Sequence, residues 1–272
     1  MKALAALAIT SFAGAAHADA RIAIGNDAFT SVRPPLDDSG FTNDLAFALW
    51  RPYRGYDVGG SVFDRMLTEV GGPRREDLIE LVGTVERAWG EPRVRELTIG
   101  LRSGPLATGN LGGRYLQNGW HTLSGTGPSL EQGLQHQYIA DRALGWLAGE
   151  RVTGAIGLPA VQAYGVVDSQ LALGTGVSSL ELAAGLRAFA RVRCTELGVH
   201  GELAYERFAA AEDALTLPGG YGTGGSHVAA RLGVHVAWGR TRIAYEYRVN
   251  EGGSGEPIGV IAVTIKQAGE RF

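Results

Sequence analysis

Hydrophobic and polar residues alternate along most of this chain, which is the pattern of β-strands with two different faces. In 180–191, every even-numbered residue is leucine or alanine, whereas the odd-numbered positions include Glu181 and Arg187. The same period of two recurs in three further segments, 197–205, 228–238 and 243–249. A chain built from such segments is expected to be all-β.

The alternation and the turn residues between the segments predict twelve strands. Their approximate bounds are 20–28, 42–50, 56–65, 76–89, 93–103, 136–148, 151–160, 171–191, 196–208, 227–239, 241–250 and 257–267. The connections alternate in length: 51–55, 90–92, 149–150, 192–195 and 239–240 are short, whereas 29–41, 66–75, 104–135, 161–170, 209–226 and 251–256 are longer. An even strand number with alternating short turns and long loops is typical of a bacterial outer-membrane β-barrel.

Two folds can use strands of this kind. A β-sandwich buries the apolar face, whereas a membrane barrel turns that face to lipid and lines its lumen with polar residues. Strands of about ten residues favour the barrel, because strands of soluble domains average five or six. Aromatic residues are predicted near strand ends, as the interface girdles of a barrel require: Trp50, Tyr53, Trp89, Trp146, Trp238 and Tyr245. We therefore predict a twelve-stranded antiparallel transmembrane β-barrel, with a soluble periplasmic sandwich as the alternative.

One predicted strand has a competing interpretation. The segment Asp77–Trp89 alternates Ile79, Leu81 and Val85 against glutamate and threonine, which favours a strand. Leu78, Leu81, Val82 and Val85 also fit a 3.6-residue period, which would make the segment an amphipathic helix. We favour the strand.

The first residues predict export. Lys2 is followed by a short apolar run and by Ala16-His-Ala18, the small-residue pattern of a secretory signal peptide. We expect residues 1–18 to be a cleaved signal peptide and residues 19–272 to form one barrel domain. Cys194 is the single cysteine, so no intramolecular disulfide is expected. A net charge of −3 with scattered arginines argues against a nucleic-acid partner.

Candidate chemistry lies at one predicted rim of the barrel. His121 belongs to Gln117-Asn-Gly-Trp-His121 in a polar, glycine-rich interval, and a loop imidazole can act as a general base near neutral pH. Asn26 and Asp27 end the first predicted strand, and Thr42 begins the second. The parity of the strands places these residues on the rim of the long loops. A carboxylate, an amide and a hydroxyl beside an imidazole could hold a hard cation and activate water.

These residues resemble the outer-membrane lipid A 3′-O-deacylase family. The resemblance rests on four short stretches of sequence: Asn26-Asp27, Phe41-Thr-Asn43, Gly104-Pro-Leu-Ala-Thr-Gly109 and Gln117-Asn-Gly-Trp-His121. It implies an enzyme in the outer membrane of a Gram-negative bacterium, surrounded by outer-membrane lipids, with its active site at the outer rim. A barrel of this size can stand alone, so we expect a monomer. The implied substrate is the lipid A part of lipopolysaccharide, from which an ester-linked 3′-acyloxyacyl group is removed.

The resemblance also implies roles for the individual residues. His121 would be the base, Gln117 its neighbour and Thr42 a supporting hydroxyl, while Asn26 and Asp27 would belong to the site and to its Ca2+ ion. Two other functions stay open. A phospholipase-like barrel would use Ser124 or Ser129 as nucleophile, and a structural barrel or narrow pore would have no catalytic residue.

Overall fold

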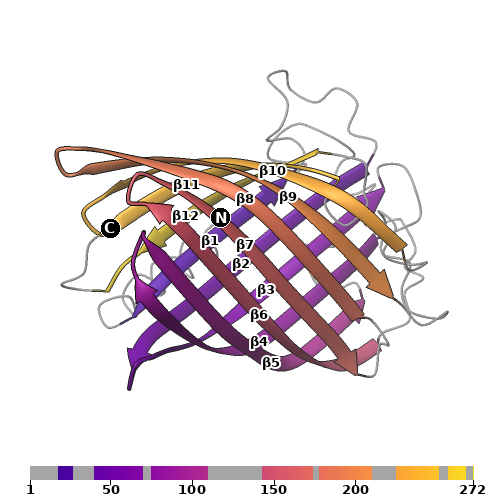
Figure 1. Ribbon diagram of the computed structural model, residues 1–272. Coiled ribbons are helices and arrows are strands. Elements are labelled where there is room, and N and C mark those ends of the chain that lie inside the picture. Colours follow the sequence, from indigo (N-terminus) through magenta and orange to yellow (C-terminus); the bar gives the residue numbers. More distant parts are fainter. Residues whose placement is uncertain are drawn as a thin grey trace, which may run out of the picture.

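The computed structural model of this protein is a closed antiparallel β-barrel (Figure 1). It describes residues 18–26, 40–69, 75–109, 143–173, 178–209, 225–250, 257–267 and 272. These residues form twelve strands: β1 (Asp19–Asn26), β2 (Gly40–Tyr53), β3 (Tyr56–Glu69), β4 (Arg75–Glu91), β5 (Arg95–Gly109), β6 (Ala143–Leu158), β7 (Val161–Leu173), β8 (Ser178–Val192), β9 (Thr195–Ala209), β10 (Gly225–Trp238), β11 (Thr241–Val249) and β12 (Pro257–Ile265). Each strand pairs with its neighbours in sequence, and β1 pairs with β12 to close the barrel.

The two faces of the barrel wall differ in polarity, as the alternating pattern predicts. Large apolar side chains stand exposed on the outside, with Leu186 and Leu203 at 63% and Leu232 at 61% exposure. The intervening residues point inward and include most of the charged side chains of β8–β11. A water-soluble sandwich would bury the apolar face, so this arrangement excludes the alternative fold. Within the described ranges, no helix is long and apolar enough to cross a membrane.

The connections define two different rims. The turn rim holds the short connections 54–55, 92–94, 159–160, 193–194 and 239–240, and the loop rim holds 27–39, 70–74, 110–142, 174–177, 210–224 and 250–256. Arg54 and Gly55 both have positive φ, at 53° and 81°, as a two-residue hairpin between right-twisted strands requires. The start of β1 and the end of β12 lie at the turn rim.

Aromatic residues gather at the turn rim, as predicted. Tyr53 and Tyr56 flank the first hairpin, and Trp89 lies near the end of β4. Arg87 stacks on two of these rings, 5.1 Å from the centroid of Tyr56 and 5.2 Å from that of Trp89. Tyr245 departs from the prediction, because it lies at the middle of β11 instead of a strand end.

The predicted bounds are wrong between residues 136 and 191. Gly149-Glu150 is not a turn but the middle of β6, where Glu150 pairs with Ser169 and Leu101. The predicted loop 161–170 is part of β7, and the predicted strand 171–191 contains the end of β7, the connection 174–177 and all of β8 except its last residue, Val192. These errors compensate, so the count of twelve is still correct.

The segment Asp77–Trp89 lies entirely within β4, so the strand interpretation is confirmed and the helical one is wrong. Residues 1–17 are outside the described part of the chain, and the signal peptide therefore stays a prediction.

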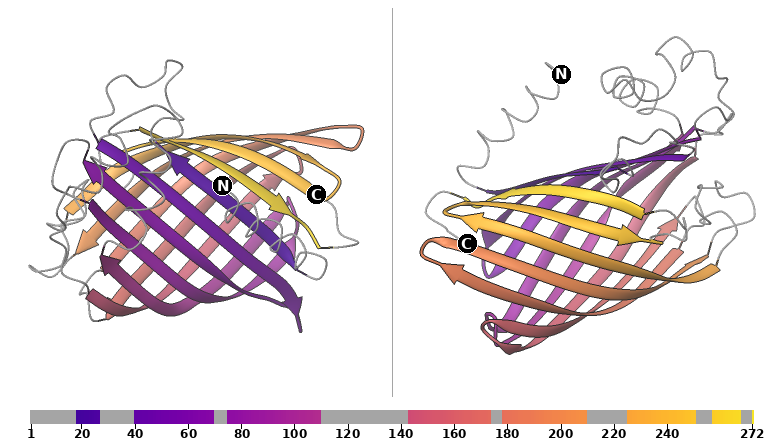
Figure 2. Two further views of the ribbon diagram at one scale, coloured as in Figure 1. Left: turned by 180° about the vertical axis from the view of Figure 1, so that it is seen from behind. Right: turned by 90° about the horizontal axis from the view of Figure 1, so that it is seen from above.

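Polar contacts of Asp19 with Lys266 and Gln267, here called the Asp19 latch, join the first and last strands at the turn rim. Figure 2 shows β1 and β12 side by side. The carboxylate of Asp19 accepts a hydrogen bond from Lys266 Nζ and another from the backbone N–H of Gln267, both at 2.8 Å. The carboxylate is buried, so these two bonds fix the seam of the barrel.

Two glycines on the inner wall make room for histidine rings. Gly233 pairs with His200 and Gly198 with His235 across the β9–β10 ladder. A Cβ on either glycine would lie 2.0 Å from Cε1 of the opposite ring. The rings therefore lie flat against the neighbouring strand, a position that only a residue without a side chain leaves open.

Substitution of Gly233 by alanine is expected to destabilise the barrel by about 1–3 kcal/mol, because the His200 ring must leave its position. The matched control is Gly154→Ala, whose added Cβ meets no atom within 4 Å. The measurement is the urea midpoint for folding into short-chain phosphatidylcholine vesicles, followed by gel mobility. Equal midpoints for the two variants would contradict this packing argument.

Candidate functional site

Two of the predicted site residues lie on adjacent strands at the loop rim. Asn26 is the last residue of β1 and pairs with Asn43 of β2 and Gly259 of β12. Thr42 precedes Asn43 along β2 and pairs with Leu67 of β3. The backbones of Asn26 and Thr42 are thus one register step apart, as the strand parity predicts.

The other predicted site residues, Asp27, Gln117 and His121, lie outside the described residues. Their connections begin and end at the loop rim: β1 leads into 27–39, and β5 and β6 are joined by 110–142. The β1–β2 and β5–β6 connections are separated around the barrel by β3 and β4.

Between the β1–β2 and β5–β6 connections, strands β4 and β5 approach each other unusually closely at Gly104. A Cβ at this glycine would lie 2.0 Å from the carbonyl oxygen of Leu81. Paired residues are found on either side, Glu80 with Leu106 and Gly83 with Ser103, but the register is interrupted at Gly104-Pro105. Proline has no N–H to donate, so the interruption follows from the sequence. The Gly104–Gly109 motif is therefore a distorted strand end that leads into 110–142.

The inside of the barrel contains a charge network that sequence analysis did not identify. Arg231 of β10 forms ion pairs with three carboxylates, at 2.6 Å to Glu181, 2.7 Å to Glu202 and 2.7 Å to Glu206. Glu181 and Glu206 are directly opposed across β8 and β9, where like charges repel. Arg231 bridges them through one guanidinium nitrogen, Nη2.

A second cluster lies near the turn rim around Glu196, which is 2% exposed. Arg93, in the β4–β5 turn, donates a hydrogen bond to this carboxylate from across the lumen. Arg191 lies 3.4 Å and Arg242 3.7 Å from the same group. The Arg242 guanidinium also lies 4.2 Å from the ring centroid of Phe272, so the last residue of the chain is held at this end of the lumen.

Two histidines also lie on the lumen side of the wall and contact glutamates. His200 Nε2 lies 2.9 Å from Glu246 of β11, and His235 Nε2 lies 3.5 Å from Glu196. The available sequence signal was the inward register that places opposite charges on adjacent strands, such as Glu202 opposite Arg231. Contacts between strands distant in sequence, such as Arg187 of β8 with Glu96 of β5 at 2.8 Å, carried no such signal.

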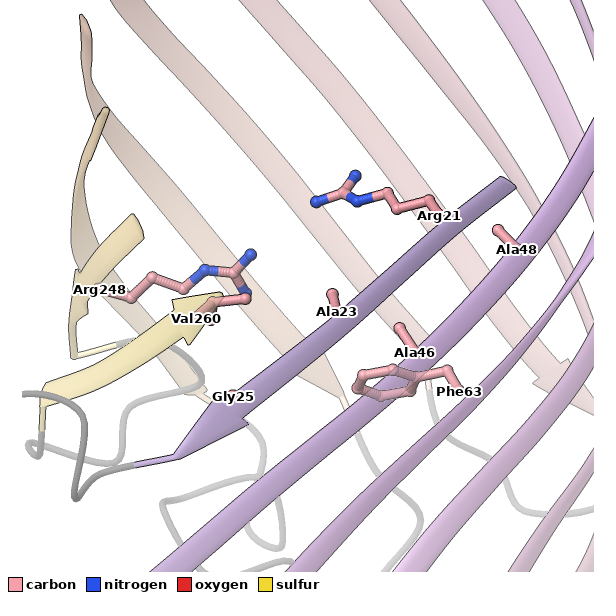
Figure 3. Close-up of a pocket in the computed structure, with 8 residues that line it drawn as sticks. All are labelled: Arg21, Ala23, Gly25, Ala46, Ala48, Phe63, Arg248 and Val260. Carbon is pink, nitrogen blue, oxygen red and sulfur yellow. The ribbon is translucent and has the colours of Figure 1, made fainter. Parts of the chain in front are cut away.

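Another part of the lumen, away from the charge network of β8–β10, contains a cavity. A cavity of about 190 Å3 lies against β1–β3, β11 and β12 (Figure 3). It is lined by Arg21, Ala23, Gly25, Ala46, Ala48, Phe63, Arg248 and Val260. Alanine and glycine on β1 and β2 leave this space open, whereas arginine, glutamate and histidine fill the lumen beside β8–β10.

The donors predicted for Ca2+ are chemically suitable. Asn26 and Asp27 would supply amide and carboxylate oxygens, which are ligands that Ca2+ prefers. Thr42 begins the neighbouring strand at the same rim. In the described ranges, no group of three His, Cys, Asp or Glu side chains could hold a metal ion, and Asp27 is outside those ranges.

The closed antiparallel barrel, with an apolar outer face and a charged lumen, defines an outer-membrane-type β-barrel protein. Solved structures of that class have the same fold. LpxR from Salmonella typhimurium superposes with a TM-score of 0.61 at 12% identity, covering 91% of this chain and 99% of that one. The beta domain of the Bordetella autotransporter BrkA gives 0.51 at 13% identity, covering 91% and 97%. No family model matches the sequence, and no curated protein matches it.

Proposed function

We propose that this protein is an outer-membrane hydrolase that removes an ester-linked acyl group, the 3′-acyloxyacyl group, from lipid A of lipopolysaccharide. One observation carries the proposal: Asn26 and Thr42, which the family resemblance assigns to one site, stand one register step apart at the loop rim. The likeness to LpxR, a lipid A 3′-O-deacylase, supports it at the level of the fold.

The chain is long enough for His121 to join these residues. His121 follows Gly109, the end of β5, by twelve positions, so an extended chain spans up to about 40 Å. Four strand spacings separate β5 from β1, which corresponds to about 20–30 Å around a barrel of tilted strands. Residues 110–142 can therefore bring His121 to Asn26 without any change in the barrel.

The proposed reaction is a general-base hydrolysis. His121 takes a proton from water, and the water oxygen attacks the carbonyl carbon of the ester. The bond from this carbon to the sugar oxygen then breaks, and the protonated His121 returns the proton to that oxygen. Gln117 would orient His121, and Thr42 would donate a hydrogen bond within the site. Asn26 and Asp27 would hold a Ca2+ ion, whose charge stabilises the oxyanion.

The location suits this substrate. The loop rim is the outer rim in a barrel whose short turns face the periplasm. Lipid A occupies the outer leaflet, and its acyl esters lie at the level where the strands end. The enzyme would act on a neighbouring lipid, with no need for the substrate to enter the lumen.

The proposal is tested by mass spectrometry of lipid A from cells that express the protein. Compared with cells carrying an empty vector, the expected result is a species lighter by one acyloxyacyl group. In isolated membranes, its further formation should stop with a calcium chelator and resume with added Ca2+. An unchanged spectrum, with correct insertion confirmed by heat-dependent gel mobility, would contradict lipid A hydrolysis. Labelling by a serine-directed covalent inhibitor would instead support a phospholipase-like enzyme.

A further inference from the structure

The lumen is filled unequally, and two arginines line the cavity beside β1–β3, β11 and β12. Beside β8–β10, arginines are matched with glutamates, and four of the inward positions on β1 and β2 are small. These residues are Ala23, Gly25, Ala46 and Ala48. The cavity above them holds two guanidinium groups, Arg21 from β1 and Arg248 from β11 (Figure 3).

The two arginines differ in their partners. Arg248 donates a hydrogen bond from Nε to Glu246, whose other carboxylate oxygen lies 2.9 Å from His200 Nε2. Both oxygens of Glu246 are thus already in contact with donors. Among the described residues, no hydrogen bond or ion pair engages the guanidinium of Arg21, which is exposed to the cavity.

The described charges near Arg21 are mostly positive. Its electrostatic neighbours are Arg248, Arg151 and Glu246, which are two cations and one anion. Arg151 lies 3.8 Å from Asp168, but Arg102 donates a hydrogen bond to that same carboxylate. Among the described groups that act on Arg21, cations therefore outnumber anions, and a charge without an ion-pair partner inside a protein wall is costly.

We propose that this cavity binds a phosphate group. The planar fork of a guanidinium matches two phosphate oxygens, so Arg21 would supply a bidentate contact and Arg248 a second charge. A volume of about 190 Å3 corresponds to about six waters of roughly 30 Å3 each, and it is smaller than the pockets of about 300–1,000 Å3 that enclose whole drug-sized ligands. One phosphate group with its waters fits this space.

This site is independent of the proposed hydrolysis. Arg21 lies inside the barrel, five positions before Asn26, whereas the hydrolytic site is at the rim. The phosphate could be the free ion, or the head group of a phosphorylated amphiphile entering through the lumen. The chemistry of recognition is the same for both sources.

The experiment is isothermal titration of the full-length barrel in a non-ionic detergent with inorganic phosphate and, separately, with soluble dihexanoyl phosphatidic acid. Saturable binding of either supports the site: binding of phosphate itself identifies the free ion, and binding of the amphiphile alone identifies a head group. Arg21→Gln is expected to weaken binding at least about tenfold, because a charged hydrogen-bond pair is lost.

A second variant tests the cavity without changing its charge. Ala46→Leu fills the space beside the arginines and is expected to weaken binding by a similar factor. The control is Arg51→Gln, which removes one positive charge at an exposed position of β2 outside the cavity and should leave the affinity unchanged. The proposal is overturned if neither ligand binds saturably to the wild type, or if Arg21→Gln and Ala46→Leu both bind as tightly as Arg51→Gln.

Discussion

Replacement of His121 by alanine is expected to lower the rate of acyl release from lipid A by about 10²–10⁴-fold, because the reaction loses its general base. The measurement is the initial rate of fatty acid release from purified lipopolysaccharide by the detergent-solubilised barrel with Ca2+ present. In the mutant, the remaining groups of the site could still bind the ester, but no side chain would accept the proton from the attacking water.

The matched control is His136→Ala, which removes an imidazole from the same connection, 110–142. This variant should retain the wild-type rate. Added imidazole should partly restore the rate of His121→Ala, since a free base can replace a missing one but cannot repair a misfolded loop. Full activity in His121→Ala would remove this residue from the mechanism, and equal losses in both variants would indicate a structural role for the connection.

Replacement of Arg231 by methionine is expected to destabilise the barrel by about 3–5 kcal/mol, the cost of removing one partner from buried ion pairs. Methionine keeps most of the length of the side chain but none of the charge. Glu181 and Glu206 would then oppose each other across β8 and β9 without the cation that joins them. The free energy of unfolding should be measured from urea-dependent folding into phosphatidylcholine vesicles, followed by tryptophan fluorescence.

Two further variants define the origin of this effect. Arg231→Lys keeps the charge but loses the planar guanidinium, which can contact several carboxylates at once. The stability of this variant should lie between those of the wild type and Arg231→Met. In the Glu181→Gln background, Arg231→Met should cost less, because one of the opposed charges is already absent. If the double variant lost the sum of the two single effects, Arg231 and Glu181 would not be energetically coupled.

Most of the fold could be predicted because lipid and lumen select residues of opposite polarity on alternate positions. The pattern was clear in β8, where leucine and alanine face lipid at every even number of 180–190. It was weak in β7, because Gly165 and Ser169 interrupt the apolar face, and the strand was mistaken for a loop. The Gly149-Glu150 turn was predicted for a related reason: glycine followed by a charged residue is typical of a hairpin, but here it is the middle of β6.

For the candidate site, strand parity predicts only at which rim of the barrel each residue lies. Parity places Asn26 and Thr42 at the same rim, where their backbones lie one register step apart on β1 and β2. The lumen network could not be derived in the same way. Arg231 with Glu202 follows from adjacent strands, but Arg93 with Glu196 depends on the curvature of the whole barrel, which brings the β4–β5 turn to β9. Local sequence patterns contain no information about that distance.

The Asp19 latch has a consequence for how the protein is made. Asp19 and Lys266 are 247 positions apart, so the contact that fixes the seam joins two residues that are almost as distant in sequence as this chain allows. Until β12 has been synthesised, β1 and the last completed strand would each present unpaired N–H and C=O groups, which hydrocarbon cannot satisfy. A nascent chain of eleven strands therefore does not form a smaller closed barrel in the bilayer. Insertion and closure have to occur as one cooperative event, after translation of the final residues.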